Sequence, residues 1–123
     1  MKKVLSSLLL LSLLIALVGC QPEFVGNAYT TNTGYHMEFS VLNRMEEAEL
    51  SLSDGEELRV IISLTEGSIA LTISGNEENA YNGKGLKNEA FTVGIPAAGR
   101  YRITVTGTNA AGTVEVLKRS AGK

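Results

Sequence analysis

Apolar and polar residues alternate with a period of two in several stretches after Gly34, and this pattern limits the fold more than any other feature of the chain. The clearest examples are residues 68–74 and 100–106. Successive side chains of a β-strand point to opposite faces, so each stretch predicts a strand with one face in the core and the other in water. We expect the following side chains to point inward: Phe39, Val60, Ile62, Leu71, Ile73, Val93, Tyr101, Ile103 and Val105.

Turn-forming residues lie between these stretches. Glu66-Gly67 separates two strongly alternating stretches and predicts a tight hairpin. Further turns are expected at Asp54-Gly55, Pro96–Gly99 and Asn109–Gly112. Residues 44–49 are compatible with a helical turn, but the alternation that follows favours a strand over 48–52.

These signals together predict about seven or eight short antiparallel strands, spaced about ten residues apart. We therefore expect an all-β fold, an antiparallel β-sandwich of jelly-roll or immunoglobulin-like type over residues 34–123. The Cys…Trp…Cys set of true immunoglobulin domains is missing, because the chain has one cysteine and no tryptophan.

The first twenty residues have a different character. Lys2 and Lys3 precede an apolar run over residues 4–18, and the small residue Gly19 precedes Cys20. A basic start, an apolar centre and a small residue before the cut describe a secretory signal peptide. The run is shorter than the roughly 20 apolar residues that a transmembrane helix needs.

The sequence Leu17-Val18-Gly19-Cys20 resembles the lipobox of bacterial lipoproteins, in which signal peptidase II cuts before the cysteine. The resemblance implies cleavage between Gly19 and Cys20 and a diacylglyceryl thioether on Cys20. We therefore expect a cleaved signal helix over 1–19 and a protein that is lipid-anchored, outside the cytoplasm, to the bacterial cell membrane or outer membrane. An ordinary secretory signal and an uncleaved anchor are the alternatives.

Residues 20–33 precede the first alternating stretch. They contain Pro22, Gly26 and a run of polar residues, and no helical or strand period extends across them. We expect a lipidated tether there, a mobile linker that reaches at most about 45 Å when fully extended. The alternative is that Phe24 and Tyr29 dock on the domain or on lipid.

The charge of the chain bears on its partners. The full chain has 11 basic and 13 acidic residues and a net charge of −2. Loss of residues 1–19 removes Lys2 and Lys3, which makes the mature chain more negative by two charges. A mildly acidic protein has little attraction for nucleic acid, so no nucleic-acid partner is expected. Attachment to the membrane is expected through the lipid on Cys20.

The second half of the chain carries another resemblance. Residues 67–73, 91–93, 99–105 and 111–114 form a series of strand and turn motifs that includes Gly99-Arg100-Tyr101-Arg102-Ile103. Over about residues 54–117, this series resembles the bacterial pre-peptidase C-terminal domain. The resemblance implies a jelly-roll sandwich and at most an accessory binding role. Those domains usually accompany a secreted peptidase, and these 123 residues contain no peptidase segment.

Residues that build common catalytic sites are scarce. His36 is the one histidine, and the alternation places it on the polar face of its strand. Cys20 is assigned to the lipid, and no serine lies in a Gly-x-Ser-x-Gly motif. Metal sites with cysteine or paired histidine are excluded by this composition. We therefore expect a protein that is not an enzyme, with no catalytic residue and no cofactor.

Acidic residues cluster at two expected turns. Asp54, Glu56 and Glu57 lie at one, and Glu77 and Glu78 lie at the other. Calcium binds carboxylate and carbonyl oxygens, although neither cluster has the spacing of an EF-hand. Solvated turn charges are the alternative, and the sequence leaves open whether calcium binds at Asp54 or Glu77.

Residues 75–87 form the longest stretch without a strand period, and we expect a loop there. Asn79, Tyr81, Asn82 and Lys84 would combine an aromatic platform with polar neighbours, which suits ligand binding, and a mobile connection is the alternative. We therefore expect a binding or interaction module for an envelope protein, a peptide or a glycan. A structural or envelope-maintenance role without a specific ligand is the alternative.

Overall fold

The structure, a computed structural model, describes residues 21–75 and 77–120. The expected signal peptide and Cys20 lie outside these residues. The described residues form seven β-strands. They contain no helix that is long and apolar enough to cross a membrane. The strands are β1 (Phe24–Thr31), β2 (Gly34–Leu42), β3 (Met45–Leu52), β4 (Glu56–Gly75), β5 (Glu78–Leu86), β6 (Asn88–Gly94) and β7 (Gly99–Ser120).

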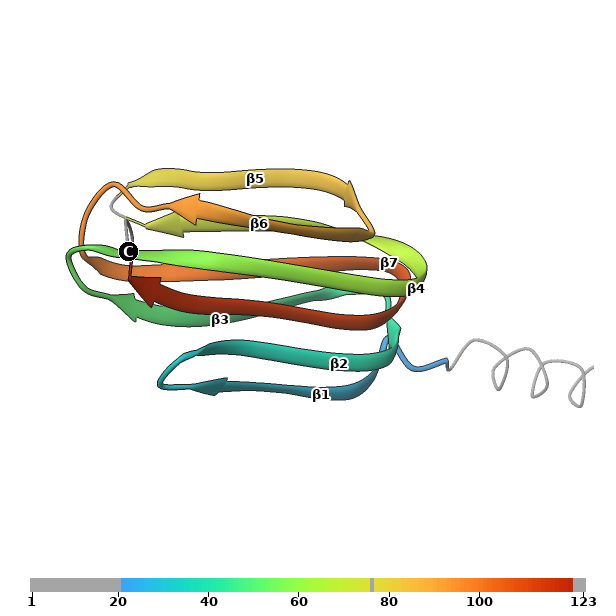
Figure 1. The fold of residues 1–123 in the computed structure, drawn as a ribbon. Coiled ribbons are helices and arrows are strands. Elements are labelled where there is room, and N and C mark those ends of the chain that lie inside the picture. Colours follow the sequence, from blue (N-terminus) through green and yellow to red (C-terminus); the bar gives the residue numbers. More distant parts are fainter. Residues whose placement is uncertain (1–20, 76, 121–123) are drawn as a thin grey trace, which may run out of the picture.

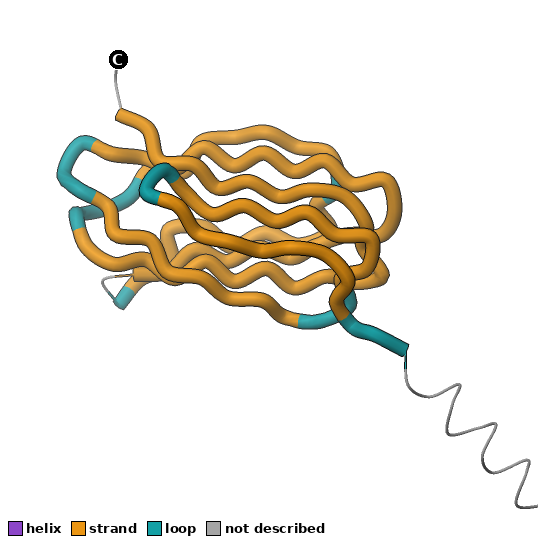
Figure 2. The backbone as a smooth tube through the Cα atoms, turned by 90° about the horizontal axis from the view of Figure 1, so that it is seen from below, coloured by secondary structure: helices purple, strands orange, loops and turns teal. Residues whose placement is uncertain are grey.

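One antiparallel hydrogen-bonded sheet folds over into two layers, which Figure 2 shows stacked on each other. One layer has the order β1-β2-β7-β4-β6, and the other has the order β3-β7-β4-β5. β4 and β7 take part in both layers because they are 20 and 22 residues long and use one half in each. The expected antiparallel β-sandwich is confirmed, although two of its strands are much longer than expected.

β4 and β7 reverse direction as they pass from one layer to the other (Figure 1). The two halves of β4 pair with the two halves of β7 and not with each other. The hairpin prediction at Glu66-Gly67 is therefore wrong, and Asn109–Gly112 lies within β7 instead of forming a separate turn. The alternation is the same whether two stretches pair edge to edge or face each other across a core, so the sequence pattern does not separate these cases.

The inward faces of both layers form one apolar core. All nine side chains predicted to point inward are at most 4% exposed. No polar or charged residue among the described ones is buried. The period of two therefore predicted the facing of the central strands correctly, because one face of each strand is fully covered by the opposite layer.

The prediction of a tether over residues 20–33 is wrong for most of its length. Residues 24–31 form β1, which pairs with β2 along its whole length at the edge of one layer. The inward positions of β1 are the small residues Gly26, Ala28 and Thr30, so the strand shows no apolar alternation. At Gly26 a side chain would overlap the backbone of β2, so glycine is required there.

The two ends of the sandwich differ. The chain enters β1 at one end, where β4 and β7 also reverse (Figure 1). We call this the entry end. The opposite end, the far end, carries the turns β1–β2, β3–β4 and β4–β5 and the loop β6–β7. Strand segments of eight or nine residues separate the two ends by about 30 Å.

Candidate functional site

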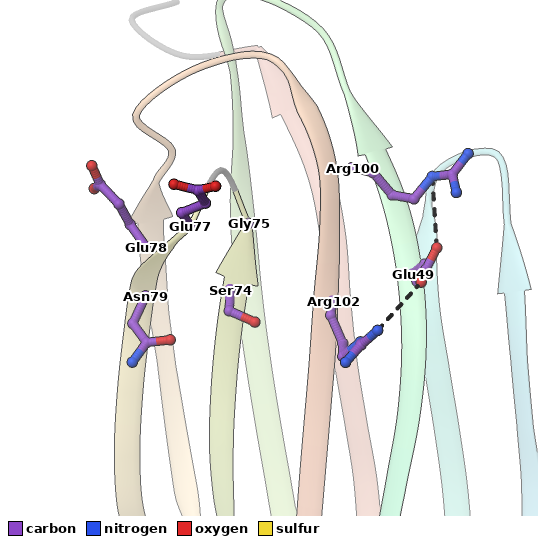
Figure 3. A pocket seen from close by; sticks show the side chains of 8 residues that line it. All are labelled: Glu49, Ser74, Gly75, Glu77, Glu78, Asn79, Arg100 and Arg102. Carbon is purple, nitrogen blue, oxygen red and sulfur yellow. Dashed lines mark ion pairs between the residues drawn. The ribbon is translucent and has the colours of Figure 1, made fainter.

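An open groove of about 370 Å³ lies at the far end of the β3-β7-β4-β5 layer (Figure 3). It runs over the outer face of that layer, since Arg100 and Arg102 alternate with the buried residues Tyr101 and Ile103. Four strands and the β4–β5 turn contribute side chains. The groove is lined by Glu49, Ser74, Gly75, Glu77, Glu78, Asn79, Arg100 and Arg102.

Strand pairing fixes the order of the side chains across the groove. Arg102 pairs with Glu49 of β3 on one side and with Ser74 of β4 on the other. Ser74 in turn pairs with Asn79 of β5. Directly opposed residues of antiparallel strands have Cβ atoms about 5 Å apart, so these four side chains form one continuous polar row across the layer.

Ion pairs orient the two arginines. Arg100 Nε lies 3.6 Å from Glu49 Oε2, and an Arg102 terminal nitrogen lies 3.9 Å from Glu49 Oε1 (Figure 3). Arg102 Nε also lies 3.4 Å from Glu47 Oε2. The Arg100 and Arg102 side chains are 75% and 58% exposed, so solvent screens these pairs and a ligand can compete for both guanidinium groups.

Two carboxylates lie on the other side of the groove. Figure 3 shows Glu77 and Glu78 across Ser74 from the two arginines. Glu77 has a φ of 63°, in the left-handed region where a non-glycine residue costs about 1–2 kcal/mol. The groove therefore presents two arginines, paired with glutamates of β3, on one side and two further carboxylates on the other, with hydroxyl and amide groups between them.

The predicted ligand loop over residues 75–87 is wrong, because most of this stretch forms the edge strand β5. Two register shifts along the β4–β5 pairing interrupt the alternation and hid the strand. Asn79 does line the groove. Tyr81 instead packs against the core and against Phe91, with ring centroids 4.8 Å apart, so it is not an exposed platform.

Asn82 and Lys84 also lie on β5, outside the residues that line the groove. Asn82 Oδ1 accepts a hydrogen bond from Thr72 Oγ1 at 3.5 Å. Lys84 is exposed. Of the four residues proposed from the sequence, the structure brings only Asn79 to the groove.

The sequence reasoning missed the arginine side of the groove. A signal was present, since Arg100 and Arg102 flank an inward-facing tyrosine and therefore had to face outward together. Their partners Glu49 and Ser74 belong to two other strands. Only the pairing of β3, β7 and β4 brings them together, and no local pattern encodes it.

Two carboxylates near the acidic turn at Asp54 make contacts within the fold. Glu56 Oε1 accepts a hydrogen bond from the Ser53 N–H at 2.7 Å, and Glu57 Oε2 lies 3.5 Å from Arg119 Nε. Within residues 21–75 and 77–120, no group of three His, Cys, Asp or Glu side chains converges as metal ligands. The carboxylates of Glu56 and Glu57 are thus engaged in a turn contact and an ion pair, and nothing supports calcium at Asp54 or Glu77.

His36 lies away from the groove, in β2 of the other layer. Its ring stacks on Tyr29 with centroids 5.0 Å apart, and its Nε2 lies 3.4 Å from Thr31 Oγ1. On the side away from Tyr29, His36 pairs in the strand register with Glu115 of β7. No ion pair or hydrogen bond joins these two side chains in the described part of the chain, and the contacts of the ring are those of a surface stacking arrangement.

A second open groove, of about 480 Å³, lies near the entry end. Its ionisable side chains are Glu38 and Glu66, and no cation lines it. The far-end groove is the better candidate because it combines side chains of both charges with neutral hydrogen-bonding groups.

No protein-family model matches the chain, and a search of the curated proteins found no match either.

Proposed function

We propose that this protein is a bacterial lipoprotein that faces outside the cytoplasm and uses its β-sandwich as a binding module for an envelope protein, a peptide or a glycan. The observation that carries the proposal is the position of the groove. It lies at the far end of the sandwich, about 30 Å from the end where the chain arrives from Cys20. A lipid anchor at Cys20 therefore leaves the groove open to a ligand.

The lipobox-like sequence before Cys20 supports the anchor. Only Gln21, Pro22 and Glu23 separate Cys20 from β1. Four residue steps span at most about 14 Å, far less than the reach expected for a long tether. The acyl chains would therefore hold the sandwich directly at the membrane surface, with little free linker.

The chemistry of the groove supports a ligand with several polar groups. Arginine binds carboxylates through paired hydrogen bonds, and Arg100 and Arg102 are exposed enough to do so. Glu77 and Glu78 suit amino groups or hydroxyl groups on the other side. A peptide, or a glycan with acidic groups, offers both kinds of partner within one ligand.

Binding is favoured over catalysis because the groove has no nucleophile beside a base. Ser74 is the hydroxyl residue of the groove, and the one histidine lies in the opposite layer. The net negative charge argues against a nucleic-acid ligand.

Capture experiments with the full-length protein in detergent test the groove. We expect an envelope protein, peptide or glycan to bind the wild type and to bind Arg102→Ala at least tenfold more weakly, since a charge-assisted contact is lost. Arg59→Ala is the matched control, because Arg59 is on β4 in the other layer and does not line the groove. Equal binding by all three proteins would exclude the groove, and no ligand at all would favour the structural role.

The anchor has its own test. Cys20→Ser should abolish incorporation of labelled fatty acid and release the protein from the membrane fraction. Labelling of this variant at the wild-type level would rule out the anchor without any consequence for the groove.

A further inference from the structure

The sandwich has four edge strands among the described residues, and they differ in charge. β1, β3, β5 and β6 each pair on one side only, so each presents unpaired backbone groups on the other. Charged side chains on edge strands hinder pairing with another chain. β1 has no charged residue, whereas the other three carry Glu46, Glu47 and Glu49 (β3), Glu78 and Lys84 (β5), and Glu89 (β6).

β1 also exposes apolar side chains. Val25 is 42% exposed and Tyr29 is 55% exposed, and they are two of only four large hydrophobic side chains exposed among the described residues. Both lie on the outer face of the layer, in the same alternation as Asn27. We propose that β1 pairs antiparallel with β1 of a second copy and joins two sandwiches into a dimer through one continuous layer.

Symmetry restricts the register of such a pair. Identical edges related by a twofold axis perpendicular to the sheet are antiparallel, and directly opposed residues of antiparallel strands share a face. The axis must then pass where one residue opposes its own copy. With Asn27 at the axis, Val25 opposes Tyr29 of the second copy, and the two exposed apolar side chains cover each other.

Charge favours a second copy as the occupant. Pairing of β3 with its own copy would bring Glu47 and Glu49 against glutamates of the same sign. Both copies of this chain carry a net negative charge. β1 is the edge at which they can pair without placing like charges opposite each other, because β1 has no charged residue. The charged edges of β3, β5 and β6 also stop further growth, which limits the assembly to a dimer.

The size of the contact predicts a weak dimer in dilute solution. An eight-residue ladder covers a strip of about 27 Å by about 10 Å, well below the roughly 800 Å² per partner of a stable interface. Confinement to a membrane raises the local concentration of the two copies. That one condition rests on the proposed anchor, whereas the pairing itself does not.

A cysteine placed at the axis tests the pairing. Asn27→Cys in the full-length protein should form a disulfide-linked dimer in native membranes under mild oxidation, because residue 27 opposes its own copy. Glu47→Cys on β3 is the matched control and should stay monomeric. Absence of the Asn27→Cys dimer, or equal cross-linking by the control, would overturn the proposal. The wild type, which has only Cys20, should give no dimer, and a dimer through Cys20 would contradict the anchor and leave the next experiment to decide the pairing.

A second experiment places charges at residue 27, at the proposed axis, and needs no cysteine. Asn27→Lys and Asn27→Asp each place like charges opposite one another, so each variant alone should be monomeric in detergent at concentrations where the wild type dimerises. A 1:1 mixture should restore the dimer, because opposite charges then meet. Asn27 is exposed, so neither change affects the core. Wild-type levels of dimer in both single variants, no rescue by mixing, or assemblies that grow beyond a dimer would each refute the pairing.

Discussion

At the residue scale, Tyr101 links the apolar core to the backbone of the β6–β7 loop through a side-chain hydrogen bond. Its side chain is fully buried, and its hydroxyl donates a hydrogen bond to the Ala97 carbonyl at 2.6 Å. A tyrosine that bonds back to the backbone a few residues upstream is known from β-sandwiches as a tyrosine corner. The contact fixes the β6–β7 loop at the start of β7, next to the groove.

Tyr101→Phe should lower the free energy of unfolding by about 1–3 kcal/mol, because a buried polar contact is lost while the ring is kept. Urea denaturation measures this change. Tyr29→Phe is the control, since Tyr29 is mostly exposed and should lose less than about 0.5 kcal/mol. Similar losses in both variants would mean that the Tyr101 hydrogen bond does not stabilise the fold.

Tyr35 gives a prediction for alkaline pH. Burial, aided by the negative charge of Glu46, raises the pKa of Tyr35 from 10.0 to about 12. Between these values the unfolded chain releases the phenol proton and the folded chain keeps it, so stability is full below pH 10 and falls as the pH rises toward 12. Urea midpoints at pH 9 and pH 11.5 should show this fall, and Tyr35→Phe should reduce it. An unchanged pH dependence in the variant would assign the effect to other groups.

At the element scale, the reversals of β4 and β7 hold the two layers together. Gly67 has a φ of +69°, and a Cβ there would overlap the backbone oxygens of Thr108 and Asn109 in β7. The two reversals therefore pack directly against each other, backbone to backbone. Gly85 has a similar φ of +65°, with open space around it.

Alanine substitutions at Gly67 and Gly85 distinguish the cost of a left-handed φ from the cost of steric overlap with a neighbouring backbone. Gly85→Ala should cost about 1–2 kcal/mol of unfolding free energy, from the left-handed φ alone. Gly67→Ala should cost clearly more, because the backbone of β7 must also move. Thermal or urea unfolding of both variants gives the comparison, and equal costs would show that the two reversals are not in close contact.

At the scale of the whole molecule, β1 belongs to the domain that we expected to begin at Gly34. It pairs with the full length of β2, and Phe24 packs against the core. A chain that begins at Gly34 should therefore be less stable in urea than one that begins at Gln21, by about 2 kcal/mol or more from the lost apolar burial and strand pairing. Equal midpoints for the two chains would restore the tether interpretation of residues 20–33.

The alternation along the chain was sufficient to assign the side chains that face the core. The period of two in β2, β4 and β7 identified Phe39, Val60, Ile103 and the other inward residues, because each of these strands has one face fully covered by the opposite layer. It also indicated an all-β sandwich, since turn residues recur at the spacing of short strands. Both results could be read locally, because the alternation of a strand and the residues of a turn each lie within a few positions along the chain.

Which strands pair and which faces meet depends on contacts between distant parts of the chain. Glu66-Gly67 is compatible with a hairpin or with a reversal between layers, and the closing of the core around both halves of β4 selects the reversal. β1 and β5 lack clear alternation because edge strands bury little, so only pairing with β2 and β4 makes them strands. The groove follows from the same cause: Glu49, Ser74 and Arg102 share one row because distant strands pair in a register that no local pattern contains.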